Sequence, residues 1–493
     1  MDVVIIGAGG AGLSAAKTLL KQPSSVISSV KIVEALSYIG GRIKADDEFI
    51  PGHRVDLGAE YIHGFKTILT EVVDESKDEW ESRLDEDEEL LEDIFIIAHA
   101  DGGPDEKPTK NGEYGVYYLG KEDTLLRYDT DDADFQYLSE AIDNLKWEIE
   151  DDENDCVKEK TEEAVNISLG AYLDEHIEVP SRMSGILESG FGNTAACTDL
   201  YKISLSSTID FEKYWEENEV AGDTRLHSKI GMVGVVDSIV EKHLKNDDRF
   251  SIHLNWTVAS ISRDSNGVTI TSKDGTMLKA DKAIVTVPPP IITSNDIVFD
   301  PPLPTWKLEA YKMVGMEGAI KIIVKFNQKV WPEKVQNVIA GDMPIPEIWF
   351  RSMKTKVNDG EYETCHLAVG FLTSKAADNL VRILEECVDQ DRNEKAAQII
   401  LHQLSQMFKF DKHIVDDAYE SAIIYDWKSI PSIKGGYMYP KVGMEKSDFH
   451  RMAKSIDSQL FFAGEATNTG ACCTVQAAME TGKCAADEII ACT

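Results

Sequence analysis

The chain has 493 residues, of which 43% are hydrophobic, and a formal net charge of −37 at pH 7. This length exceeds what one hydrophobic core usually supports, so we expect two domains. Such a negative charge argues against nucleic acid as a partner. The sequence also lacks a run of about 18 apolar residues that would predict a transmembrane anchor.

Acidic residues are concentrated in two stretches. Residues 71–93 hold 13 acids and 2 bases, and residues 143–163 hold 10 acids and 3 bases. One interpretation is a set of solvated helix faces and loops, as in a saline environment. The other is electrostatic steering of a polycation toward the protein, which salt would suppress.

The first twenty residues predict a dinucleotide-binding turn. An apolar strand over 3–6 leads into a glycine-rich turn, and a helix is expected over 13–20. Gly7 would make the tight turn, Gly9 would let the backbone approach a pyrophosphate, and Gly12 would let helix and strand pack closely. The positive end of the helix would face the phosphates.

An acid follows the second expected strand, over 30–33. Glu34 lies 22 residues after Gly12, close to the usual spacing of about 20 for an acid that binds a ribose hydroxyl. The motif continues with Gly41 and Arg42, and an arginine at this place can neutralise a pyrophosphate.

Segments near both ends of the chain carry a family resemblance. Residues 56–64 read DLGAEYIHG, residues 461–467 read FFAGEAT, and residues 473–482 read CTVQAAMETG. Together they resemble the flavin-containing amine oxidases, and most closely the polyamine oxidases. The resemblance implies an α/β fold in which a Rossmann-like FAD-binding domain is interleaved with an α+β substrate-binding domain. It also implies non-covalent FAD, because the cysteine that attaches flavin in monoamine oxidases lies in a different local sequence.

The resemblance implies how the chain is divided. The FAD-binding domain is expected over 1–70, 226–290 and 421–493, and the substrate-binding domain over 71–225 and 291–420. The first substrate segment would be an acidic, partly helical insertion.

The same resemblance implies which residues bind the cofactor. Val258 is expected against the adenine. A stretch over 426–437 partly matches the family segment beside the isoalloxazine, which makes Trp427 and Tyr437 candidate wall residues, although both are also plausible core aromatics. The full expected cofactor set is Gly7, Gly9, Gly12, Glu34, Ala35, Gly41, Arg42, Gly58, Ala59, Val258, Trp427, Gly464, Glu465, Thr474 and Val475.

Lys321 lies within an apolar stretch over 318–326, where a cation is costly unless it has a specific partner. In the family a lysine at this place holds a water against flavin N5, so the resemblance makes Lys321 a catalytic candidate. The alternative is an edge-strand lysine that extends to solvent.

The best polar candidates for substrate recognition are Glu60 and His63. They alternate with Tyr61 and Ile62 along a strand-like stretch, so these side chains cannot all face one way. By resemblance, His63 would orient the amine chain and act as a catalytic residue, whereas a purely structural histidine is the alternative. Glu60 departs from the neutral residue usual there and would contact flavin or an ammonium group.

The expected substrate set is His63, Glu60, Tyr437 and Cys472. Small residues over 470–473 replace a tyrosine with which many amine oxidases close an aromatic cage, which would open the pocket. Cys472 and Cys473 invite a redox interpretation, but adjacent cysteines bridge poorly, and packing beside the flavin is the alternative.

The eight cysteines show neither metal-ligand spacing nor a dense disulfide framework, so no metal is expected. They favour a reducing compartment, which points to the cytoplasm. Secretion is the alternative if a leader has been removed, in which case the sequons at Asn166 and Asn255 would matter.

The function implied is FAD-dependent oxidation of amines, above all polyamines, with hydride transfer to the flavin. Oxygen would then yield hydrogen peroxide, and the products would be an aldehyde and a shorter amine. The expected partners are a small-molecule amine and O2, and the protein would be a monomer or homodimer. The alternatives are an L-amino-acid oxidase in which Arg351 clamps a carboxylate, and a flavin-bound interaction or scaffold protein.

Overall fold

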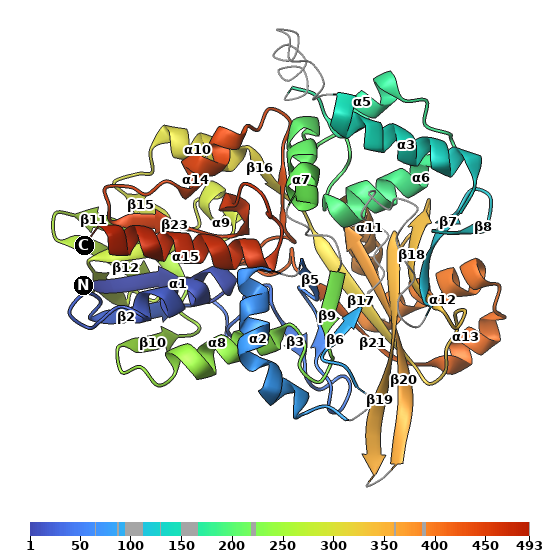
Figure 1. The fold of residues 1–493 in the computed structure, drawn as a ribbon, viewed down its shortest axis with the longest axis horizontal. Helices are drawn as coiled ribbons and strands as arrows, with labels where there is room; N and C mark the ends of the chain where they lie inside the picture. Colours follow the sequence, from blue (N-terminus) through green and yellow to red (C-terminus); the bar gives the residue numbers. More distant parts are fainter. Residues whose placement is uncertain are drawn as a thin grey trace.

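The computed structural model describes residues 1–64, 66–85, 88–93, 112–128, 130–148, 166–217, 223–358, 361–386 and 391–492. Two large sheets lie beside each other, and the two termini lie close together at the edge of the first (Figure 1). Among the helices of these ranges, none is both long and apolar enough to cross a membrane.

The first sheet has five parallel strands. Their order is β10 (Phe250–His253), β2 (Ser29–Val33), β1 (Asp2–Ile6), β14 (Lys282–Val285) and β23 (Leu460–Phe462). In β1, Val3 and Ile5 pack into the core on one face, while Val4 and Ile6 pack into the core on the other. This near-continuous apolar run is typical of a parallel sheet that is covered on both faces.

Helices cover one face of this sheet, and α1 and α15 lie side by side there (Figure 1). The covering elements are α1 (Gly10–Leu20), α2 (Ile68–Glu81), α8 (Val233–Ile239), η2 (Val240–Leu244) and α15 (Val475–Ala491). The other face carries a four-stranded sheet and two helices. These are β13 (Met277–Ala280), β12 (Gly267–Ser272), β11 (Val258–Asp264), β15 (Val298–Asp300), α10 (Thr305–Lys312) and α14 (Lys446–Ala453).

The second sheet has seven strands. Their order is β21 (Tyr419–Asp426), β17 (Ala319–Phe326), β20 (Glu361–Thr373), β19 (Glu347–Asn358), β18 (Val335–Gly341), β7 (Tyr114–Leu119) and β8 (Thr124–Arg127). Three helices pack on one face, namely α11 (Ser374–Glu385), α12 (Arg392–Phe408) and α13 (Lys412–Ala418).

Strand β17 presents different chemistry on its two faces. Ile320, Ile322 and Val324 pack into the core beneath α11, α12 and α13. Because side chains alternate along a strand, Lys321 and Ile323 face the opposite side.

Strand pairing aligns four residues in one row across the second sheet. Lys321 pairs with Tyr425 on one side and with Phe371 on the other, and Phe371 pairs in turn with Glu347. The row therefore crosses β21, β17, β20 and β19 and brings together residues that lie far apart in the sequence.

Shorter elements complete the described fold. A three-stranded sheet has the order β5 (Tyr61–His63), β9 (Asp223–Leu226) and β6 (Leu91–Asp93). The helices that lie above the second sheet in Figure 1 are α3 (Ala133–Glu148), α5 (Leu169–His176), α6 (Ser184–Leu187) and α7 (Leu205–Glu217). The remaining elements are β3 (Ala45–Asp46), β4 (Val55–Asp56), η1 (Glu188–Ala195), α9 (Pro289–Thr293), β16 (Val314–Met316), β22 (Met438–Pro440) and η3 (Glu465–Thr467).

Two features differ from the expected plan. Strands β7 and β8 lie within the insertion and extend the second sheet, whereas the sequence pattern gave no strand there. Strand β21 pairs with β17, so the boundary expected at residue 421 falls inside a strand of the second sheet. The division into two domains stays a prediction.

The contact between α1 and α15 gives a first test. A Cβ added at Gly482 would lie 2.0 Å from the carbonyl oxygen of Ala11. We expect Gly482→Ala to lower the free energy of unfolding by about 1–3 kcal/mol, because the helices must separate. Urea denaturation measures this, and Gly190→Ala is the control because its Cβ would meet nothing within 4 Å. Equal effects of the two changes would contradict the prediction.

Candidate active site

A single cavity of about 860 Å³ runs from the glycine-rich turn after β1 to strands β17 and β19 of the second sheet. Its size is within the range of small-molecule and cofactor sites. Both large sheets contribute to its wall, so the site depends on how they are placed together.

The glycine-rich turn forms one end of the cavity. Gly7 has a φ of +110°, and an added Cβ would lie 2.5 Å from Thr286 Oγ1, so a larger residue would be strained there. Gly9 and the first residues of α1 line the cavity, which places the positive end of the helix at the wall. Gly12 lies outside the wall, and its Cβ would be 2.0 Å from the Gly7 carbonyl oxygen.

Glu34 lies directly after β2 and lines the same end together with Ala35 and Val258. Its carboxylate accepts hydrogen bonds from the backbone N–H groups of Ala8 and Leu36, at 2.7 and 2.8 Å. Burial raises the pKa of Glu34 above its ordinary value. These bonds fix the carboxylate at the place where the sequence pattern expects a ribose partner.

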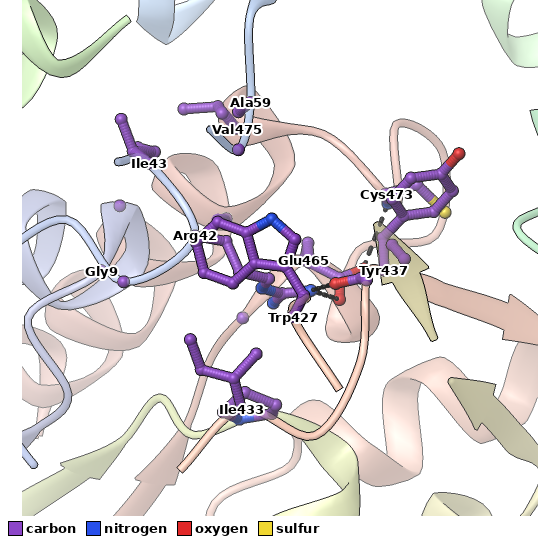
Figure 2. Close-up of a pocket in the computed structure, with 18 of the residues that line it drawn as sticks. Gly9, Arg42, Ile43, Ala59, Trp427, Ile433, Tyr437, Glu465, Cys473 and Val475 are labelled. Carbon is purple, nitrogen blue, oxygen red and sulfur yellow. Dashed lines mark hydrogen bonds and ion pairs between the residues drawn. The ribbon is translucent and has the colours of Figure 1, made fainter. Parts of the chain in front are cut away.

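Arg42 connects the two ends of the chain. Its Nη1 donates to the Gly436 carbonyl oxygen at 2.7 Å and to Glu465 Oε1 at 2.9 Å. Glu465 in turn accepts from the Cys473 backbone N–H at 3.2 Å, and Figure 2 shows these contacts on one wall of the cavity.

Aromatic side chains form the next part of the wall. Trp427 Nε1 donates to the Leu57 carbonyl oxygen at 3.0 Å, and a Cβ at Gly58 would lie 2.8 Å from the indole ring. The Tyr437 hydroxyl donates to the Thr194 carbonyl oxygen, and burial raises the pKa of Tyr437 well above its ordinary value. Both rings lie at the pocket in Figure 2.

The wall has the form that a dinucleotide requires. A Cβ added at Gly464 would meet no protein atom within 4 Å, and one at Gly9 would meet only a carbonyl oxygen at 3.8 Å. The missing side chains therefore leave space inside the cavity. The other expected cofactor residues on this wall are Gly41, Ala59, Thr474 and Val475.

Lys321 lies at the other end of the cavity. Strand β17 is internal to its sheet, and the Lys321 side chain is 5% exposed, so an edge-strand lysine extending to solvent is not what the structure shows. Its ammonium donates to Glu60 Oε2 at 2.8 Å and to the Asp56 carbonyl oxygen at 3.0 Å.

A buried charge cluster surrounds this contact; it consists of Glu60, Glu92, Arg225, Lys321 and Arg351. Glu60 Oε1 lies 3.6 Å from Arg225 Nη1 and 3.7 Å from Arg351 Nη1. Glu92 accepts from Arg225 Nε at 2.6 Å and from Arg351 Nη2 at 3.1 Å. Although burial opposes ionisation, the neighbouring cations hold the pKa of Glu60 below its ordinary value and lower the pKa of Glu92 to about 2.

His63 and the paired cysteines line the remainder of the site. The His63 ring lies 5.1 Å from the Trp215 ring, measured between centroids. The sulfur atoms of Cys472 and Cys473 are 3.5 Å apart, and Cys473 Sγ donates to the Met438 carbonyl oxygen at 2.9 Å.

The structure adds a residue that the sequence pattern did not indicate. Glu347 is buried on the cavity wall and accepts from Thr194 Oγ1 at 2.7 Å and from Asn337 Nδ2 at 2.9 Å. Burial raises the pKa of Glu347 above its ordinary value. The available signal was an acid just before the apolar run 348–350, the same signal that indicated Lys321.

Trp349 presents an unmet donor at the same end. Its Nε1–H has no hydrogen-bond partner among the described residues, although the side chain is buried and lines the cavity. Buried polar groups are normally paired, so this donor carries the cost of an unmade hydrogen bond.

A glycine-rich turn between β1 and α1 that lines a cavity, with an acid after the next strand, is typical of dinucleotide-binding proteins. Residues 11–490 match the family model described as flavin containing amine oxidoreductase, and the chain belongs to this family. The match confirms the resemblance and the α/β FAD-binding fold expected from the sequence, and it makes a flavin the cofactor.

Known proteins match over nearly the whole chain. The probable polyamine oxidase 4 of Arabidopsis thaliana is 27% identical and covers 95% of this chain and 82% of its own. The peroxisomal N(1)-acetyl-spermine/spermidine oxidase of Bos taurus is 25% identical, with coverage of 99% and 94%. A solved structure of a putrescine oxidase bound to putrescine has a TM-score of 0.73 at 18% identity and covers 99% of each chain.

The carboxyl group of Asp56 gives a test of the electrostatics. It is fully buried and accepts from the Met232 backbone N–H at 3.1 Å. Burial first, and the Glu60 carboxylate second, raise its pKa from 3.8 to about 7. The folded protein therefore keeps a proton that the unfolded chain releases, so this group costs stability as the pH rises from about 4 to 7.

We expect the stability of Asp56→Asn, measured relative to the unsubstituted protein, to increase by roughly 2–4 kcal/mol when the pH is raised from 5 to 8. Chemical denaturation at the two pH values measures the difference, with the exposed Asp74→Asn as the control. Parallel pH dependence of the variant and the unsubstituted protein would contradict the assignment.

Proposed function

We propose that the protein oxidises amines with FAD, and that polyamines are its substrates. The observation that carries the polyamine assignment is the buried Glu347 carboxyl group on the wall of the same cavity as Lys321. The matches to polyamine oxidases support the same substrate class.

Glu347 is placed to pair with a second ammonium group of the substrate. It lies two strands away from Lys321 in one row of the sheet, which separates the two backbones by about 10 Å at the usual strand spacing. Thr194 and Asn337 both donate to the carboxyl oxygens. These donors partly offset the burial that raises the pKa of Glu347, and a bound ammonium group would favour the ionised form further. A monoamine has no second ammonium group for this site.

The wall between these two residues suits the methylene chain of a polyamine. Tyr61, Trp349, Phe371 and Tyr437 all line the cavity. The Trp349 ring contacts the rings of Tyr61 and Phe371, with centroids 5.6 and 5.8 Å apart. Aromatic faces attract cations and exclude water, so this wall would hold the chain and favour one orientation.

The residues of the glycine cradle, with Glu34, Arg42 and Glu465, would hold the FAD without a covalent bond. When bound, the flavin accepts a hydride from the carbon next to the amine nitrogen and passes two electrons to O2, which takes up two protons to form hydrogen peroxide. Water then hydrolyses the resulting imine to an aldehyde and a shorter amine. Lys321 and His63 are our catalytic candidates, and both line the cavity.

No observation favours the L-amino-acid oxidase alternative. Arg351 is already paired with Glu60 and Glu92. It also lies outside the set of described residues that line the cavity. A scaffold protein would have no need for a buried lysine and a buried acid in one cavity, since burying charged groups costs free energy.

The first test is a peroxide-release assay on the flavin-bound protein with spermine, spermidine, their N-acetyl forms, monoamines and L-amino acids. We expect turnover of polyamines and at least a hundredfold loss of kcat in Lys321→Met, because the variant lacks the ammonium group. Bound FAD with no turnover of any amine would refute the proposal, and turnover of amino acids alone would favour the amino-acid oxidase.

A second test addresses Glu347. We expect Glu347→Gln to raise KM for spermine at least tenfold with little change in kcat, because binding of the remote ammonium is lost. The KM for a monoamine should not change. Steady-state kinetics measure both values, and the exposed Glu363→Gln on the adjacent strand β20 is the control. An equal increase in KM for spermine and the monoamine would contradict the assignment of Glu347 as an ammonium site.

A further inference from the structure

Lys321 is held by an acid that is itself held by two arginines. We propose that Glu60 is a positioning residue that fixes the Lys321 ammonium at the cavity wall, and that Arg225 and Arg351 fix Glu60. This inference rests on the proposed function, because it assigns a role to Glu60 in the same reaction. It replaces the substrate role that the sequence pattern suggested for Glu60.

The contacts of the ammonium group carry the first step. A lysine ammonium has three N–H donors. Two of them reach Glu60 Oε2 and the Asp56 carbonyl oxygen, both of which belong to the segment that follows β3. Lys321 itself belongs to β17 of the second sheet, so the ion pair joins two walls of the cavity. The ammonium also lies 5.2 Å from the centroid of the Trp349 ring.

The surroundings of Glu60 carry the second step. Its Oε1 faces one guanidinium from β9 and another from β19. The side chains of Glu60, Arg225 and Arg351 are 4%, 8% and 5% exposed. A different Glu60 rotamer would leave the buried Lys321 ammonium without a carboxylate partner, which is costly, and the two guanidinium groups also favour the observed position.

The charges carry the third step. The buried charge cluster holds three cations and two carboxylates, which leaves one net positive charge at a pH below about 7, where the neighbouring Asp56 carboxyl group keeps its proton. Lys321 and Glu60 line the cavity, whereas the two arginines and Glu92 lie outside the lining set. The cluster therefore presents its excess charge to the cavity as the Lys321 ammonium. A fixed cation stabilises negative charge that develops during the reduction of oxygen.

The cluster supplies its own control. Glu92 contacts the same two arginines as Glu60, but its ion pairs within the described residues are with Arg225, Arg351 and His227 and not with Lys321. Glu92→Gln and Glu60→Gln each remove one carboxylate from the cluster. A role in stability alone predicts similar effects, whereas a positioning role predicts that only Glu60→Gln affects the function of Lys321.

The first measurement needs no flavin. Urea denaturation of the apoprotein is carried out for Glu60→Gln, Lys321→Met and the double variant. We expect the effect of the double variant on the unfolding equilibrium constant to differ at least tenfold from the product of the effects of the two single changes. Additive effects, within twofold, would overturn the proposed contact.

The second measurement is the reoxidation of dithionite-reduced flavin by O2, followed by flavin absorbance. We expect Glu60→Gln to slow reoxidation at least tenfold, Glu92→Gln to change it less than twofold, and the double variant to be no slower than Lys321→Met. Equal slowing by Glu60→Gln and Glu92→Gln, or a slower double variant, would overturn the proposal. If Glu60→Gln does not fold, Glu60→Asp takes its place, since it keeps the charge but shortens the reach, and unchanged reoxidation in that variant would overturn it.

Neither measurement uses an amine. A protein that reoxidises rapidly but turns over no amine would therefore refute the proposed function and leave the role of Glu60 standing. If the protein turns over polyamines but Glu60→Gln and Glu92→Gln affect reoxidation equally, the role of Glu60 is refuted and the proposed function stands.

Discussion

The ion pair between Lys321 and Glu60 is the contact on which the site depends. It buries two opposite charges at the junction of two sheets, where either charge alone would be very costly. Arg225, Arg351 and Glu92 extend the pair into a cluster, and its five members come from five separate segments of the chain. The Lys321–Glu60 contact connects strand β17 to the segment before β5, and the cavity lies between these walls.

Different physical properties, backbone shape and buried charge, dominate the two ends of the cavity. Backbone shape dominates the glycine-rich end, where added Cβ atoms would collide with the protein or fill the space for a ligand. Buried charge dominates the other end, where Lys321, Glu60 and Glu347 face one space among aromatic rings. The first end is suited to hold a large cofactor, and under the proposed function the second would bind the ammonium groups of the substrate.

Local patterns were sufficient to predict much of this structure. The glycine turn, Glu34 and the apolar strand around Lys321 are encoded in short stretches, and the structure places them along one cavity. Glu347 was not predicted because its position relative to Lys321 depends on the register of β17, β20 and β19, which no short stretch of sequence specifies. The partners of Glu60 were not predicted for the same reason, since Arg225 and Arg351 contact it from strands that are distant in the sequence.

The cavity wall includes both Gly7 and Val475, so its lining spans almost the whole length of the chain. Strand β23 and helix α15, which complete the first sheet and cover it, come from the last part of the sequence. A ribosome makes the chain from the N-terminus onward, so the nascent protein has the phosphate-binding turn long before it has a closed cofactor site. A complete cofactor site therefore forms only after these last elements have been made.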